Sequence, residues 1–279
     1  MQCSGEVLVN STTVAPSLAA LGECDGSPAL SQSGLWPSLV QEAGQIGVEI
    51  DPIAAARLAR YRGLLIEWNS RMNLTAVRDP QEMERKLFLD AVTMIPLLDT
   101  VSTPRRGELS RPASLIDIGT GAGFPGLVLK LLRPTLEVTL VDATAKKVAF
   151  LQAVIDDLKI AGVRAVHGRA EDLGQDRAFR ERFDIATARA VAALPVLLEY
   201  LVPFLRVGGG AILPKGIEIS DELRDGALAA RVLRAEIVGS PLSPISTTRL
   251  IQVRKTGVTP AAYPRRTGVP AQSPLVGGG

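Results

Sequence analysis

The stretch Asp117-Ile118-Gly119-Thr120-Gly121-Ala122-Gly123-Phe124-Pro125-Gly126 joins a short β-branched run to a segment with helical periodicity. Glycines at alternate positions let the backbone turn sharply and approach a ligand, and the helix that follows begins with unpaired N–H groups. Asp142 closes the next apolar run, 21 residues after Gly121. A carboxylate at that place can accept hydrogen bonds from both hydroxyls of a ribose. The stretch therefore predicts a nucleoside-binding turn at the carboxyl end of a strand.

Outward from this turn, short β-branched runs alternate with longer helical segments. Strands are predicted at Ser114–Ile118, Glu137–Asp142, Arg164–His167, Phe183–Ala186, Gly210–Leu213, Leu233–Val238 and Arg249–Arg254. Helices are predicted between them at Pro125–Leu132, Thr144–Leu158, Leu194–Leu205 and Ile219–Ala230. This alternation predicts an α/β fold: a doubly wound, Rossmann-like, mostly parallel seven-stranded sheet. A Ser/Pro loop without a helix joins the last two strands, which predicts an antiparallel pair at one edge.

Four parts are expected along the chain. They are a flexible extension at residues 1–45, a helical cap and linker at 46–112, the α/β domain at 113–256, and a basic tail at 257–279. Within the cap, Asp51-Pro52 and Asp79-Pro80 each place an N-cap residue before a proline at the first helical position. The apolar spacing after them predicts one helix to Trp68 and a second to about Leu98.

Scarce residue types exclude several chemistries. Cys3 and Cys24 both fall in the N-terminal extension, and His167 is the single histidine. Thiolate catalysis, a zinc cluster, any other metal site and a disulfide framework are therefore not expected. The lack of a basic leader and of about 18 consecutive apolar residues predicts a cytoplasmic protein without a membrane span. The net charge of +2 hides an uneven distribution, because no acid follows Glu236.

The glycine turn is compatible with two cofactors. Gly121-x-Gly123-x-x-Gly126 matches the dinucleotide fingerprint, so an NAD(P)-dependent oxidoreductase is the alternative interpretation. Asp117 leads the turn, and an acid there suits a ligand with an ammonium group and repels a pyrophosphate. The chain also lacks a Tyr-x-x-x-Lys pair for hydride transfer. These features favour S-adenosyl-L-methionine.

Further candidates lie at the ends of the later strands. After the third strand, Ala170 and Glu171 could read an adenine, or Glu171 could merely cap a helix. Arg189 ends the fourth strand, where it could clamp a phosphate or guanine, or pair with Asp117 or Glu171. Lys215 closes the fifth strand and is a candidate RNA-phosphate contact.

Several motifs occur in the order found in one known family. They are Trp68-Asn69, Asn73-Leu74-Thr75-Ala76, the glycine turn, Asp142-Ala143-Thr144, Ala170-Glu171, Ala188-Arg189-Ala190, Lys215-Gly216 and Tyr263-Pro264-Arg265-Arg266. Over residues 50–275 the chain resembles the bacterial 16S rRNA guanine-N7 methyltransferases of the RsmG, or GidB, family. The chain departs from the family pattern at Leu87, where histidine is usual, and at Ser273, where lysine is usual.

The resemblance implies contacts to S-adenosylmethionine and to RNA. The cofactor contacts that we expect are Gly119, Gly121, Phe124, Asp142, Ala143, Thr144, Ala170, Glu171 and Arg189, and the RNA contacts are Arg189, Lys215, Arg265 and Arg266. The implied partner is 16S rRNA or the 30S subunit, and the implied target is N7 of one guanine in the decoding region. We expect a monomer. A catalytically silent RNA-binding assembly factor with the same fold stays open.

The residue inventory agrees with a guanine-N7 target. Methylation at carbon-5 of a pyrimidine normally uses a cysteine nucleophile, which residues 46–279 lack. The Asn/Asp-Pro-Pro-aromatic motif typical of adenine amino methylation is absent. Guanine N7 carries a free lone pair and no proton, so positioning it against the activated methyl suffices. We therefore expect no essential general base, and His167 is expected to be a packing or hydrogen-bonding residue.

Overall fold

A seven-stranded sheet forms the centre of the computed structural model, which describes residues 36–101 and 112–276. The strands are β1 (Ser114–Ile118), β2 (Glu137–Asp142), β3 (Val163–His167), β4 (Phe183–Thr187), β5 (Leu205–Lys215), β6 (Ala235–Gly239) and β7 (Arg249–Lys255), in the spatial order β3-β2-β1-β4-β5-β7-β6. Strand β7 runs antiparallel to both of its neighbours, and the other pairs are parallel. The predicted doubly wound sheet and its antiparallel edge are confirmed.

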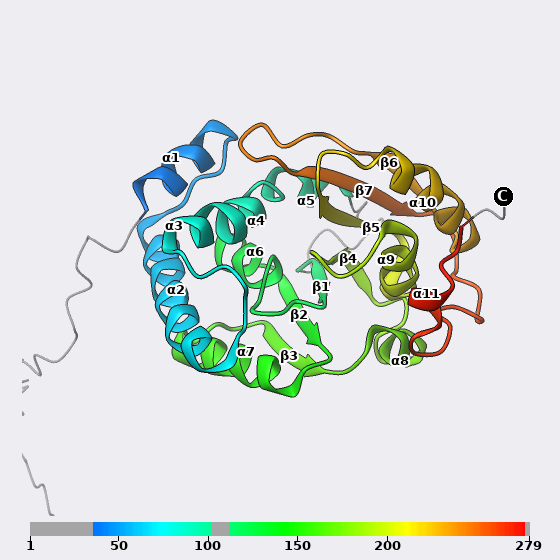
Figure 1. Cartoon of the computed structure of the whole chain (residues 1–279), viewed down its shortest axis with the longest axis horizontal. Helices are drawn as coiled ribbons and strands as arrows, with labels where there is room; N and C mark the ends of the chain where they lie inside the picture. The colour runs from blue at the N-terminus through cyan, green and yellow to red at the C-terminus, as the bar shows by residue number, and fades with distance from the viewer. Residues whose placement is uncertain (1–35, 102–111, 277–279) are drawn as a thin grey trace, which may run out of the picture. The chain divides into compact units, whose positions relative to one another are not determined.

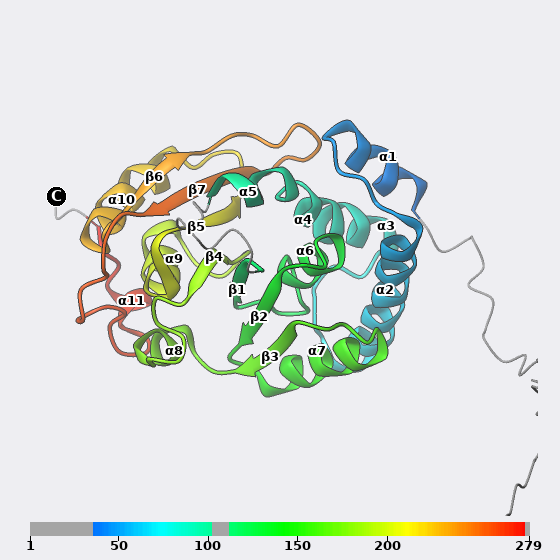
Figure 2. The same ribbon diagram turned by 180° about the vertical axis from the view of Figure 1, so that it is seen from behind.

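Helices cover both faces of the sheet. They are α6 (Gly126–Leu132), α7 (Ala145–Asp157), α8 (Ala170–Gln175), α9 (Leu194–Leu201), α10 (Ser220–Val232) and α11 (Val269–Gln272), preceded by α1 (Pro37–Gln45), α2 (Pro52–Met72), α3 (Pro80–Met83), α4 (Asp90–Val92) and α5 (Leu98–Val101). Figures 1 and 2 show α2, α4, α6 and α7 on one side of the sheet and α8, α9 and α10 on the other. Because the first five strands, β1 to β5, pair in parallel, their carboxyl ends lie at the same edge of the sheet.

Two hydrophobic clusters form because successive strand residues point to opposite faces. In β1, Leu115 joins the cluster that contains α6 and α7, whereas Ile116 joins the cluster that contains α9 and α10. Such sheets are buried on both faces, which explains the nearly continuous apolar strands. The first cluster also contains Leu58 and Leu65 of α2. The helices of the predicted cap thus share one core with the sheet.

The N-terminal region differs from expectation in two places. The prediction of a flexible extension over residues 1–45 is wrong for Pro37–Gln45, which forms α1 with Leu39 and Ala43 buried; residues 1–35 lie outside the described residues. The predicted helix from Pro80 is interrupted by a π-helical segment at Glu84–Leu89 and by a 3₁₀ turn at Ile95–Leu97. Pro96 lacks the N–H that a continuing helix needs there.

Two glycines test how tightly the helices pack. Gly63 lies exposed within α2, and apart from its chain neighbours and the adjacent backbone of the same helix, no atom of the described chain lies within 4 Å of a Cβ built there. We expect Gly63→Ala to raise the free energy of unfolding by about 0.5–1 kcal/mol, because alanine loses less backbone entropy.

Gly126 is the matched contrast, because its Cβ would lie 2.7 Å from Leu140 Cδ2 and 2.8 Å from Asp117 Oδ2. Gly126→Ala should lower the free energy of unfolding by about 1–3 kcal/mol through overpacking. Urea denaturation of both variants measures the two effects, and equal effects would contradict this account of the packing.

Candidate cofactor site

A buried carboxylate holds the glycine turn. Asp117 Oδ2 accepts hydrogen bonds from the Gly126 N–H at 2.8 Å and from the Thr120 hydroxyl at 2.6 Å. Asp117 is fully buried, and its Oδ1 has no hydrogen-bond partner among the described residues. Burial raises the pKa of this carboxyl to about 7, against the opposing effect of its two hydrogen bonds. Because Asp117 is fully buried and both of its hydrogen bonds go to the turn and the start of α6, its role in the structure is to fix the turn.

Helix α2 supports the turn from the other side. The hydroxyl of Tyr61 donates to the carbonyl oxygen of Ala122, and its ring stacks on Phe124 with centroids 5.3 Å apart. A Cβ at Gly123 would lie 2.6 Å from the Tyr61 oxygen, so only glycine fits there. The helical periodicity of the sequence places Tyr61 on an apolar helix face, but it does not predict the hydrogen bond from Tyr61 to Ala122. The ring of Phe124 is buried in the same aromatic cluster as Phe88.

Asp142 brings the ends of two strands together. Its Oδ2 accepts from the Gly121 N–H at 2.9 Å, and its Oδ1 accepts from the Thr144 N–H at 2.8 Å. The ammonium group of Lys147 lies 3.7 Å from Oδ2. The predicted residues Gly121, Asp142 and Thr144 are therefore neighbours in space, although the chain separates the first two by 21 positions.

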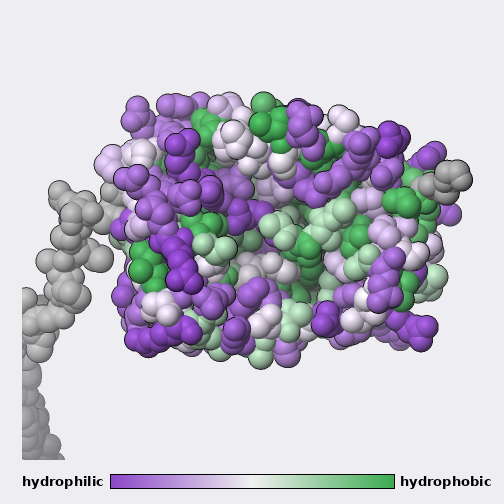
Figure 3. Space-filling model, viewed as in Figure 1, coloured by the Kyte–Doolittle hydropathy of each residue, from purple (hydrophilic) through white to green (hydrophobic). Residues whose placement is uncertain are grey.

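A cavity of about 240 Å³ opens at this edge of the sheet. Four of the predicted cofactor residues line it: Gly119, Ala143, Ala170 and Glu171. The other lining residues are Ile118, Val141, Gly168, Arg169, Val191, Ala192, Tyr200 and Ala271. We call it the adenosyl cavity, after the predicted cofactor residues that line it. Figure 3 shows that the face seen in Figure 1 is hollowed near its centre, with hydrophobic and neutral residues bordering much of the hollow and hydrophilic residues mainly toward the periphery.

Glu171 is a side chain of the adenosyl cavity and does not cap its own helix. It is the second residue of α8, and its Oε1 accepts a hydrogen bond from the Gly268 N–H at 3.0 Å. Glu171 is buried, and its nearness contributes to raising the pKa of Tyr200, after burial of the Tyr200 hydroxyl as the main cause. The alternative of a simple helix cap is wrong, since the partner lies 97 residues away.

A larger groove, of about 880 Å³, lies beside the adenosyl cavity. It is lined by Asp79, Gln81, Glu82, Arg85, Lys86, Leu89, Asp90, Arg189 and Pro244–Thr248. We call it the substrate groove. The Arg189 guanidinium donates to the Lys86 carbonyl and lies 3.4 Å from Asp90 Oδ2. The proposed pairing of Arg189 with Asp117 or Glu171 is therefore not formed, and Asp90 takes their place.

The predicted RNA-binding residues fall into two groups. Arg189 lines the substrate groove and Arg266 is exposed. Lys215 instead forms an ion pair with Glu222 at 2.6 Å and donates to a backbone carbonyl at 2.9 Å. Arg265 pairs with the buried Glu199 at 2.6 Å. Both of these side chains are engaged within the protein, so their RNA contacts stay predictions.

Two further properties concern the described part of the chain. No cluster of three or more His, Cys, Asp or Glu side chains is placed there to hold a metal ion. None of its helices combines the length and apolar character that crossing a membrane requires. The imidazole of His167 is exposed and lies 3.1 Å from the Ala143 carbonyl oxygen.

Comparison with known proteins assigns the family. Residues 54–240 match the family model GidB, described as rRNA small subunit methyltransferase G. The chain belongs to this family. A protein named ribosomal RNA small subunit methyltransferase G from Alkaliphilus oremlandii is 40% identical over 243 residues, covering 85% of this chain and 98% of that protein. Proteins of the same name from Desulfitobacterium hafniense and Caldanaerobacter subterraneus are 42% and 43% identical, over 83% and 85% of this chain and 94% and 97% of theirs.

Family membership confirms the resemblance found in the sequence. The protein is a methyltransferase, and its cofactor is S-adenosylmethionine. The oxidoreductase alternative is dropped, because the glycine turn and Asp142 belong to a methyltransferase of matching length. The contacts of individual residues with the cofactor stay predictions.

The buried Asp117 gives a pH-dependent stability. Its folded-state pKa of about 7 lies above the ordinary value of 3.8, so the folded protein binds more protons than the unfolded chain between these values. The free energy of unfolding should therefore fall as the pH rises from about 4 to about 7, and Asp117→Asn should remove this slope. Urea unfolding across that range measures it.

Asp221→Asn is the control, because it removes the same charge from a side chain that is 85% exposed. Parallel pH profiles of wild type and Asp117→Asn would show that Asp117 is ionised in the folded protein and would refute this account.

Proposed function

We propose that this protein transfers the methyl group of S-adenosylmethionine to N7 of a guanine in 16S rRNA. The rRNA substrate is supported by the family and by the names of the relatives. The guanine-N7 target is supported by the motifs quoted from the sequence. Acting on a ribosomal subunit places the protein in the cytoplasm. That the protein acts as a monomer stays a prediction.

The observation that carries this proposal is the turn from Arg189 to Ala192. Arg189 lines the substrate groove, whereas Val191 and Ala192 line the adenosyl cavity. The turn follows β4 at the carboxyl edge of the sheet, where α/β folds bind their ligands. A nucleotide in the groove and a cofactor in the cavity would therefore be separated only by the four-residue turn from Arg189 to Ala192.

The residues of this edge have positioning roles in the proposed reaction. S-adenosylmethionine supplies a methyl group on a positively charged sulfur. Asp142 would accept hydrogen bonds from the ribose, and Glu171 and the Ala170 backbone would contact the adenine. Gly119 lets the backbone come close, since even a Cβ there would lie 2.7 Å from Val191 Cγ2. Arg189, held by Lys86 and Asp90, would face the incoming nucleotide.

No group of the protein has to remove a proton, because guanine N7 is a free lone pair. The rate then comes from holding the acceptor in line with the methyl group in a site with little water. The residues named above therefore bind the two ligands and position them, and none of them acts as an acid or a base.

Methyl transfer to RNA is the direct test. The full chain, radiolabelled S-adenosylmethionine and either naked 16S rRNA or 30S particles are incubated, and the modified nucleotide is mapped. We expect label at N7 of one guanine, with Arg189→Lys lowering kcat/KM for RNA about tenfold or more, because lysine cannot reproduce the guanidinium contacts. Label at another atom would overturn the guanine-N7 assignment. Cofactor binding without any transfer would favour the silent assembly factor.

His167 tests the absence of a general base. Its ring contacts the Ala143 carbonyl and is exposed, so it is placed to support the backbone of the adenosyl cavity. His167→Asn, which keeps a hydrogen-bond donor, should leave kcat within about tenfold of wild type at saturating cofactor and RNA. A larger loss of kcat with unchanged binding of both ligands would show that His167 takes part in proton transfer.

A further inference from the structure

The chain after the last strand returns to the adenosyl cavity. Residues 257–276, which we call the C-terminal segment, run from β7 past α9 and α8 and end beyond α11 (Figure 1). Ala271 of α11 lines the cavity together with Glu171 of α8 and Tyr200 of α9. One part of the cavity wall is therefore supplied by a segment that contains no strand and only one short helix, α11. Side-chain contacts with the rest of the protein must hold this segment in place.

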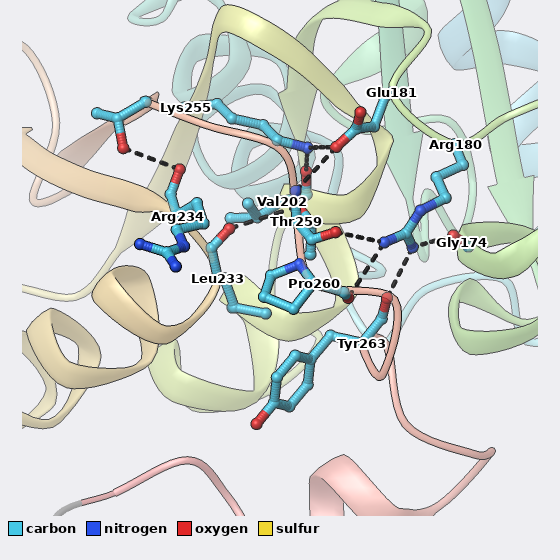
Figure 4. Close-up of polar contacts among 11 residues, drawn as sticks. Gly174, Arg180, Glu181, Val202, Leu233, Arg234, Lys255, Thr259, Pro260 and Tyr263 are labelled. Carbon is cyan, nitrogen blue, oxygen red and sulfur yellow. Dashed lines mark hydrogen bonds and ion pairs between the residues drawn. The ribbon is translucent and has the colours of Figure 1, made fainter.

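One set of contacts fixes the beginning of this segment. The Arg180 guanidinium donates to four backbone carbonyl oxygens, and Glu181 accepts from the Lys255 ammonium group at 2.7 Å and from the Thr259 N–H at 2.9 Å (Figure 4). The four carbonyls belong to Gly174, Thr259, Pro260 and Tyr263, at 2.7–3.2 Å. The loop between α8 and β4 thus anchors the segment as it leaves the sheet.

A buried ion pair fixes the middle of the segment. Arg265 Nη2 donates to Glu199 Oε2 at 2.6 Å, and Arg265 Nε donates to Glu199 Oε1 at 2.9 Å. The Arg265 backbone N–H donates to the same Oε1 at 2.8 Å. The Glu199 side chain is 0% exposed, so its carboxylate depends on these contacts in place of water. Glu199 immediately precedes Tyr200, a lining residue of the cavity, in α9.

The contacts that follow lie at the cavity itself. The Thr267 hydroxyl donates to Asp172 at 2.9 Å, and the Gly268 N–H donates to Glu171 at 3.0 Å. Helix α11 begins immediately afterwards and carries Ala271. The position of Ala271 therefore follows from where Arg265 is held, six residues earlier.

We propose that the ion pair between Arg265 and Glu199 is a positioning device for the adenosyl cavity. It docks the C-terminal segment so that the wall at Ala271 is complete and Glu171 is oriented. Arg265 then acts on the binding of the adenosyl half of the cofactor and makes no contact with RNA. This inference rests on the proposed placement of the cofactor. Neither the family resemblance nor the sequence pattern assigns such a role to Arg265 or Glu199.

Calorimetry with S-adenosylhomocysteine tests the positioning role. Arg265→Lys keeps the charge but loses the paired donors, and Glu199→Gln keeps the shape but loses the charge. If the segment is docked only a tenth of the time in either variant, the Kd rises about tenfold. The KM for RNA, measured at saturating S-adenosylmethionine, should stay within about twofold of wild type, because neither side chain would face RNA.

Arg206→Lys is the matched control. Arg206 and Asp184 form another buried ion pair, but at the amino ends of β5 and β4, the edge opposite to the cavity. This variant should lower Tm while leaving the Kd for S-adenosylhomocysteine unchanged. A rise in Kd equal to that of Arg265→Lys would mean that general destabilisation causes the effect, and the inference would fall.

A smaller probe locates the effect on the cofactor. 5′-Methylthioadenosine carries the adenosyl half alone, so the Arg265→Lys penalty should have the same fold-change for this compound as for S-adenosylhomocysteine. A penalty confined to S-adenosylhomocysteine would place the effect at the amino-acid half and overturn the inference.

The remaining outcomes separate this inference from the proposed function. An unchanged Kd with a raised KM for RNA would make Arg265 an RNA contact and overturn the inference alone. If wild-type protein bound neither probe, the proposed function itself would fail, and the inference would fall with it.

Discussion

The Asp117 carboxylate is the interaction on which the carboxyl edge of the sheet depends. It lies at the end of β1, beneath the glycine turn, and one of its oxygens binds both the Thr120 hydroxyl and the first N–H of α6. A helix start has unsatisfied N–H groups, and a buried acceptor there fixes the direction in which the helix leaves the strand. Gly126 must be glycine for this to happen, because the carboxylate occupies the space of a Cβ. The strand, the turn and the helix are thus determined by one side chain.

The same turn explains why the N-terminal helices belong to the working enzyme. Tyr61 of α2 donates to Ala122 and packs against Phe124, so the turn is held between the carboxylate below and an aromatic cluster beside it. A ligand-binding loop fixed on both sides loses little conformational entropy when the ligand binds. Helix α2 therefore helps to fix the shape of the glycine turn, in addition to contributing Leu58 and Leu65 to the core.

Sequence patterns predicted the strands best where apolar side chains dominate. The bounds of β1 and β2 agree to the residue with the expected runs, because each is a short, largely apolar stretch with an acid at or next to its last position. Strand β5 is longer than the expected Gly210–Leu213, since glycines conceal its first half. Close packing requires Gly209 and Gly210: a Cβ at Gly210 would lie 2.0 Å from the Val101 carbonyl oxygen. A contact 109 positions away in the sequence leaves no local pattern, and the same holds for Tyr61 and for the partner of Glu171.

Charge was harder to interpret, because a basic residue in a sequence does not show whether its partner is internal. Basic residues of the acid-free C-terminal part pair with acids of preceding elements: Lys255, at the end of β7, with Glu181, and Arg265, in the C-terminal segment, with Glu199. The positive charges of Lys255 and Arg265 are therefore neutralised within the protein, although the sequence suggested that the basic C-terminus was available to bind RNA. The substrate groove, in contrast, contains both signs: Arg85, Lys86 and Arg189 line it together with Asp79, Glu82 and Asp90. A phosphate accepts hydrogen bonds and is repelled by carboxylates, whereas the edges of a base present donors and acceptors together. A groove of mixed charge is therefore better suited to hold a base turned out of its stack than to follow an RNA backbone. That fits an enzyme whose target atom is on the base.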